Sequence, residues 1–320
     1  MKTFNGFIRS SQASLRRLEK VQIELNKIQN IQANLKNVNS YNSYLDGLIT
    51  IHENISKKID WIELAARKAP IKPTMTNENE QEWRNKINTY NPSIFDKIFK
   101  LQERRKLNLN EKLICAIKED KKKFQALLAI FNYNYDNWLK VNRLSKKILG
   151  GDIDAYNEAY QSFKPFDSIK NIGKKIFLIS DKESAELTLI ANEIKIIPTY
   201  VLTQTSTGKL STKEFVVTKR NEFYKEHICS ATFRVAREIF NLLPLKAIVI
   251  NIALENPSKF NGRIEEQTIL SVFFDSETFQ KINYENISPS MAVLNFKHNI
   301  NYSRLKGFDI TQRLILKDGF

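Results

Sequence analysis

Apolar residues recur at helical spacing through the first part of the chain. From Leu18 to Val38 they follow a 3-4-3 spacing that shifts its phase once, after Ile28. This spacing is typical of an amphipathic helix packed in a bundle or helical hairpin, and also of a short coiled coil. Asparagine and serine are frequent over 37–43, so we expect a break there and a second helix over 44–64.

A linker and a long helix are predicted in the rest of the first half. Pro70 and Pro73 mark the linker, because proline lacks a backbone donor and restricts the residue before it, so we place a sub-boundary near 70–77. Apolar positions at helical spacing then predict one long helix over 108–149. Gly150-Gly151 ends it, since glycine is favoured just past a helix end.

After residue 151 the apolar residues follow short runs and alternation rather than helical spacing. Strands are predicted over 176–179, 185–190, 247–252 and 268–274, a hairpin joins 199–203 to 210–217, and a strongly apolar helix is predicted over 221–243. We therefore expect an α+β fold. An all-helical N-terminal unit over 1–150 precedes an α+β domain over 151–320 with a mostly antiparallel or mixed sheet.

Positive charge is concentrated in the first of these two parts. The whole chain has 50 Lys+Arg and 35 Asp+Glu, a net charge of +15. Residues 1–150 hold 28 basic and 15 acidic side chains, whereas 151–320 hold 22 and 20. Such asymmetry indicates two units with different partners, one of them polyanionic. We therefore expect the N-terminal unit to contact nucleic acid or an acidic protein.

The remaining composition narrows the class of protein. No apolar run approaches the roughly 18–20 residues that span a bilayer, and the first residues lack the apolar core of a signal peptide. Cys115 and Cys229 lie far apart, which argues for a reducing compartment and against a disulfide framework or a cysteine zinc site. Three scattered histidines predict no metal site, and no motif predicts a cofactor. We expect a cytoplasmic protein.

The candidate nucleic-acid-binding residues form three basic clusters on or beside predicted helices. They are Arg104, Arg105, Lys106, Lys121, Lys122, Lys123, Arg143, Lys146 and Lys147. Lysine and arginine at this density neutralise phosphates, and the aromatic residues of 124–138 are placed to stack on bases. Two structural alternatives stay open, because lysine runs on helices are usually solvated surfaces and aromatic residues at helical spacing usually pack in a core.

A metal-dependent nuclease is the alternative function. Asp181, Glu193 and Lys195 resemble the spacing of the restriction-endonuclease-like site, in which two carboxylates hold a divalent metal and a lysine orients the attacking water. An acid followed by Glu-x-Lys also arises by chance in a chain with 27% charged residues, and 181–184 has the composition of a turn. The leading interpretation is therefore a protein without catalytic activity.

A narrow polar column crosses the apolar helix predicted over 221–243. It consists of Glu222, Glu226, Ser230, Arg234 and Glu238, spaced by four. A helix that is apolar over most of its circumference is buried in a core. The column therefore lines an interface, or it holds an internal ion pair between Arg234 and Glu238 at i, i+4. Arg234, Glu238 and the adjacent Arg237 are the interface candidates.

The stretches 91–99, 224–230 and 234–240 resemble a family of uncharacterised bacterial proteins. The resemblance extends over most of the chain after about residue 59. It implies a bacterial or phage origin and the same helical plus α+β layout, and it assigns no catalytic residue. Our leading hypothesis is a binding or scaffold protein, in a bacterial defence or mobile-element system, that assembles with itself or with other chains through the N-terminal helices. A purely structural subunit is the third hypothesis.

Overall fold

The computed structural model describes residues 2–53, 56–93, 100–167, 169, 171–173, 175–257 and 262–316, with the backbone alone for 2–19, 21 and 175–180. The chain divides into two compact units: 60–150 forms one, and 1–59 joins 151–320 in the other. The expected boundary at Gly150-Gly151 is one of the two division points. The expected unit over 1–150 is not a single body, because the N-terminal helix packs on elements of the C-terminal half.

Helices build the unit 60–150. The described helices are α2 (Trp61–Ala66), α3 (Glu78–Asn88) and α5 (Gln102–Leu149). The long helix predicted over 108–149 is confirmed, with an earlier start. Side chains of α5 hold the segment around α2: Asn142 Nδ2 donates to the Ala65 carbonyl at 2.7 Å, and Trp138 Nε1 donates to the Arg67 carbonyl at 2.8 Å.

Asp120 of α5 fixes the start of α3. Its carboxylate is buried and accepts hydrogen bonds from Asn79 Nδ2 at 2.7 Å and from the Glu80 amide at 2.9 Å. A carboxylate at this place satisfies an amide that has no partner inside the helix, and it interacts favourably with the helix dipole. This acid next to the Lys121–Lys123 run is therefore structural.

We expect Asp120→Ala to lower the free energy of unfolding of 60–150 by about 1–3 kcal/mol, because the Glu80 amide and the Asn79 side chain lose their acceptor. Trp61, Trp83 and Trp138 are the three tryptophans of the chain and all lie in this unit, so urea unfolding followed by tryptophan fluorescence reports on it. Glu119→Ala, at the exposed neighbouring acid, is the control and should cost less than about 0.5 kcal/mol. Equal effects of the two substitutions would contradict the role of Asp120.

A six-stranded mixed sheet in the order β1-β2-β5-β6-β7-β8 organises the other unit. Its strands are β1 (Lys175–Ser180), β2 (Ser184–Ile190), β5 (Ala247–Pro257), β6 (Ile264–Asp275), β7 (Lys297–Ser303) and β8 (Gly307–Asp309). Strands β2 and β5 pair in parallel, and every other neighbouring pair is antiparallel. The predicted α+β class with a mixed sheet is confirmed. The short strands β7 and β8 were not among the predicted elements.

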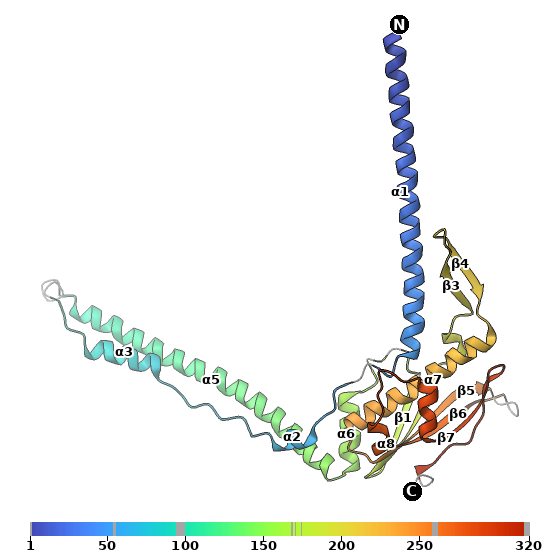
Figure 1. Cartoon of the computed structure of the whole chain (residues 1–320). Coiled ribbons are helices and arrows are strands. Elements are labelled where there is room, and N and C mark those ends of the chain that lie inside the picture. Colours follow the sequence, from blue (N-terminus) through green and yellow to red (C-terminus); the bar gives the residue numbers. More distant parts are fainter. Residues whose placement is uncertain are drawn as a thin grey trace. The chain divides into compact units, whose positions relative to one another are not determined.

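Helix α7 (Val217–Leu242) lies across the sheet (Figure 1). Ile228, Val235 and Ile239 are fully buried, and Phe233 lies against Phe274 of β6 with 5.3 Å between the ring centroids. The apolar helix predicted over 221–243 is therefore confirmed as a core element. Further elements of this unit are α6 (Ile153–Phe163), α8 (Ser276–Gln280), α9 (Pro289–Ala292) and the 3-10 turns η1 (Ile194–Ile196) and η2 (Val293–Asn295).

The C-terminal segment 311–316 packs on β5 and β6. Leu314 joins an apolar cluster of these strands, and its amide donates to Ser271 Oγ at 2.9 Å. Ser271 Oγ donates to Asn251 Oδ1 at 2.6 Å, and Asn251 Nδ2 donates to Glu186 Oε1 at 2.9 Å. This row of polar side chains across β2, β5 and β6 is thus satisfied within the chain.

Helix α1 (Lys2–Ile49) is continuous through 37–43, so the expected break and the expected helix over 44–64 are wrong. Val38, Tyr41, Leu45 and Leu48 form a buried stripe, while the asparagines and serines of 37–43 lie on the exposed side. Polar residues there mark the outer face of a packed helix rather than a loop. None of the described helices is both long and apolar enough to cross a bilayer.

The predicted hairpin is confirmed as β3 (Tyr200–Gln204) and β4 (Leu210–Glu214), and it packs on α1. Asn34 Nδ2 donates to the Gly208 carbonyl at 3.0 Å, and Gln204 Nε2 donates to the Ile31 carbonyl at 2.9 Å. Gly208 has φ +80°, and a Cβ there would lie 2.4 Å from Ile31 Cγ1. The turn therefore requires glycine, which brings the tip of the hairpin against α1.

Candidate functional site

Helix α5 carries all nine basic residues of the three predicted clusters. Eight of them are exposed and Lys147 is half-buried. Between Arg104 and Lys147 the helix rises by about 65 Å at 1.5 Å per residue. The helix contains 12 Lys+Arg and 5 Asp+Glu, and one of these acids is the buried Asp120. Most of the positive charge of 60–150 therefore belongs to one straight element.

The basic residues of α5 are not spread evenly around it. The buried residues Ala116, Asp120, Asn142, Ser145 and Ile148 define the packed side. At 3.6 residues per turn, the opposite side contains five cations and one exposed acid, Asp136. The cations, which we call the cationic face, are Lys118, Lys122, Lys140, Arg143 and Lys147. Lys118 and Lys140 were missing from the predicted clusters. Their i, i+4 and i, i+3 spacing to Lys122 and Arg143 is the signal that identifies them.

The aromatic residues of α5 pack rather than stand free. The rings of Phe131 and Tyr135 lie 5.6 Å apart, and those of Tyr135 and Trp138 lie 5.5 Å apart. Trp138 also donates its hydrogen bond to the segment after α2. Tyr133, in contrast, is 70% exposed. A base-stacking surface is thus limited to Tyr133 and the 37% exposed Tyr135, whereas Phe131 and Trp138 are half-buried and pack against neighbouring residues.

The structure does not bring the candidate nuclease residues together. Asp181 precedes β2 and Glu193 follows it, so a seven-residue strand separates them by roughly 20 Å. The Asp181 carboxylate accepts from the Glu183 and Ser184 amides at 2.9 and 2.7 Å and from Ser184 Oγ at 2.7 Å, which holds a turn. Burial raises the pKa of Asp181, but the hydrogen bonds from the Ser184 hydroxyl and from the two amides together lower it below its usual value. Glu193 pairs with Lys195 at 3.0 Å. Among the described residues, no three His, Cys, Asp or Glu side chains are grouped to hold a metal ion.

The polar column of α7 is buried at its C-terminal end. Arg234 Nη2 lies 2.8 Å from Glu238 Oε1, and the Glu238 side chain is only 1% exposed. Burial lowers the pKa of Arg234, while the adjacent Glu238 carboxylate raises it. The internal ion pair between Arg234 and Glu238 is therefore confirmed.

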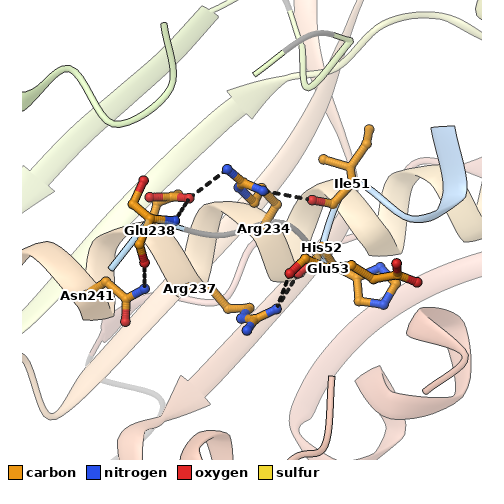
Figure 2. Close-up of polar contacts among 8 residues, drawn as sticks. Ile51, His52, Glu53, Arg234, Arg237, Glu238 and Asn241 are labelled. Atoms are coloured by element: carbon orange, nitrogen blue, oxygen red, sulfur yellow. Dashed lines mark hydrogen bonds and ion pairs between the residues drawn. The ribbon is translucent and has the colours of Figure 1, made fainter. Parts of the chain in front are cut away.

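The polar column of α7 forms its contacts with another segment of the same chain, the one that follows α1 (Figure 2). Arg234 Nη1 donates to the Ile51 carbonyl at 3.2 Å, and Arg237 Nη1 donates to the His52 carbonyl. Glu238 Oε1 accepts from the Ser56 amide at 3.1 Å. Arg234, Arg237 and Glu238 thus hold the main chain of the segment that follows α1. We call these three side chains, together with the residues that they bind, the α1 clamp.

The remaining contacts of the α1 clamp involve two buried histidines. His52 Nδ1 lies 2.9 Å from Ser230 Oγ, and His227 Nδ1 lies 3.0 Å from the Leu48 carbonyl. Burial lowers the pKa of both imidazoles. Asn241 Nδ2 donates to the Ser56 carbonyl at 2.8 Å. Sequence reasoning missed His52 and Asn241, because Ser230, the partner of His52, is 178 residues away in the sequence and the partner of Asn241 is a backbone carbonyl.

The two parts of the predicted site thus differ in what they leave exposed. The column of α7 is used internally, whereas the cationic face of α5 is open to solvent except for Lys147. Comparison with known proteins found no family model, no curated protein and no solved structure that matches this chain.

Proposed function

We propose that this protein is a non-enzymatic binding or scaffold protein of the bacterial cytoplasm and that its unit 60–150 binds the phosphate backbone of nucleic acid along α5. The observation that carries the proposal is the cationic face. The five cations lie on the side of one helix opposite its packed residues, in one group at Lys118 and Lys122 and a second from Lys140 to Lys147, with Asp136 as the acid between the groups. Such a surplus of positive charge is what neutralisation of a polyanion requires.

Two features favour nucleic acid over an acidic protein. The basic clusters extend over about 65 Å, close to two turns of duplex DNA, so one straight helix matches a long and regular array of phosphates. Four of the five members of the cationic face are lysines, which bind phosphates as point charges. Such contacts fix position on the backbone without reading bases, so we expect binding with little sequence preference.

A combined Lys118→Gln, Lys122→Gln and Lys140→Gln variant tests the proposal. It should bind a duplex of about 20 base pairs more weakly than the parent. The slope of log K against log salt should become shallower by up to about 2.7, since each phosphate contact contributes about 0.9. Fluorescence anisotropy titrations from low to physiological salt, on the full chain, measure both quantities.

The matched control removes the same charge from exposed positions of the other unit. It combines Lys209→Gln, Lys213→Gln and Lys219→Gln and should leave the affinity and the slope unchanged. A duplex of about 10 base pairs spans only half of the clusters and should bind more weakly in the parent. Equal losses in both triple variants would locate binding outside α5. A parent chain that ignores DNA and RNA at low salt but binds polyglutamate would show that the partner is an acidic protein.

Assembly through the N-terminal helices and a place in a bacterial defence or mobile-element system stay predictions. Light scattering of the full chain tests the first of them. The proposal that the cationic face binds nucleic acid does not depend on either of these predictions.

A further inference from the structure

The first part of α1 has a face of its own that the rest of the helix lacks. The backbone is helical from Lys2. At 100° per residue, the large apolar residues of the first five turns fall within a sector about 100° wide. These positions are Phe4, Phe7, Ile8, Leu15 and Leu18.

Basic positions occupy the opposite face of the same segment. Lys2, Arg9, Arg16, Arg17 and Lys20 fall within a second sector about 100° wide, centred about half a turn away. Glu19 is the only acidic residue between positions 2 and 20. A helix with phenylalanine and leucine on one face and lysine and arginine on the other is typical of segments that lie in the surface of a membrane.

Among the residues whose side chains are described, the chain begins to cover α1 at Ile31. The β3–β4 hairpin reaches α1 at Ile31, where Gly208 lies. In the part of α1 whose side chains are described, Lys20 and residues 22–30 are all exposed. Leu25 and Ile28, which continue the apolar line of Leu18, are each 47% exposed. The described residues between Lys20 and Asn30 therefore lack an intramolecular cover.

We infer that residues 2–20 bind an anionic lipid surface, with the apolar face in the acyl boundary and the basic residues at the headgroups. Charge complementarity selects this occupant over a second copy of the chain. If the heptad of Leu18 and Leu25 is continued toward the N-terminus, Ser11 and Ser14 take the two seam positions before Leu18, which weakens a coiled coil there. A helix lying in the membrane surface tolerates serine at its boundary.

Flotation of the full chain with vesicles tests this inference, which does not rest on the proposed function. The parent should float with phosphatidylcholine vesicles that contain phosphatidylglycerol and stay behind with phosphatidylcholine alone. Phe4→Ser combined with Phe7→Ser should abolish flotation. Arg9→Gln combined with Arg16→Gln should weaken binding roughly twenty-five-fold, at roughly fivefold per charge.

Two control variants separate residues 2–20 from other basic surfaces. Lys27→Gln with Lys36→Gln removes two exposed charges from α1 beyond residue 20 and should float like the parent. The triple variant of the cationic face should also float like the parent, so loss of nucleic-acid binding and loss of lipid binding are distinguishable. The inference is overturned if the parent does not float with anionic vesicles, or if the phenylalanine variant floats as well as the parent. It is also overturned if that variant loses only self-association in light scattering.

Discussion

Replacing Arg234 with alanine should lower the free energy of unfolding of the unit that contains the sheet by about 3–5 kcal/mol. The substitution leaves the Glu238 carboxylate, with a side chain 1% exposed, as a buried charge without its cation. It also removes the donor to the Ile51 carbonyl, so one of the bonds that fix the end of α1 is lost. Hydrogen exchange of the α7 amides measures the effect, because the tryptophans all lie in the other unit.

A second Arg–Glu pair in this chain is a matched control. Arg84 lies 2.7 Å from Glu80 at the same i, i+4 spacing, but its side chain is 57% exposed. Arg84→Ala should cost less than about 1 kcal/mol, because exposed pairs contribute little. Replacing both members of the buried pair, as Arg234→Met with Glu238→Leu, should restore part of the loss by removing the orphaned charge. Similar losses of unfolding free energy for Arg234→Ala and Arg84→Ala would show that burial does not decide how much an ion pair contributes to stability.

Ile239→Ala should cost about 2–5 kcal/mol, through lost transfer energy and the cavity left behind. The side chain is fully buried, one turn after Val235, on the face of α7 that belongs to the core. Val217→Ala, at a 57% exposed position of the same helix, is the control and should change stability by less than about 0.5 kcal/mol. Hydrogen exchange of the α7 amides again measures the loss of stability in both variants. A loss below 1 kcal/mol for Ile239→Ala would mean that the core collapses around the truncated side chain.

Local patterns of the sequence predicted the helices α5 and α7, the hairpin and four of the six strands of the mixed sheet. Each of these elements has a period in its own residues, and glycines mark the end of α5 and the hairpin turn. The prediction failed where distant residues decide the outcome. Asn37 and Ser40 look like loop residues until the hairpin and α7 are seen to bury Val38 and Tyr41 on the other side of the helix.

The candidate site was predictable to a similar degree. The charge clusters of α5 were visible, and helical geometry alone extends them to Lys118 and Lys140. The role of the polar column was not visible, since Arg234 and Arg237 bind backbone carbonyls of Ile51 and His52. A backbone carbonyl is the same group in every residue, so the side chains of 49–59 do not indicate that their main chain binds these arginines. Only the fold itself locates it.

The α1 clamp also sets an order of events during synthesis of the chain. His52 and its partner Ser230 are 178 residues apart in the sequence. At about 5–20 residues per second, α7 leaves the ribosome roughly ten to forty seconds after the end of α1. The unit 60–150 is contiguous in the sequence and can fold in that interval. The apolar stripe of α1 stays exposed to water until the hairpin and α7 have been synthesised. The unit that contains the sheet is therefore the slower of the two to complete its fold. Its N-terminal helix is the segment that a chaperone has the longest time to bind before the native contacts form.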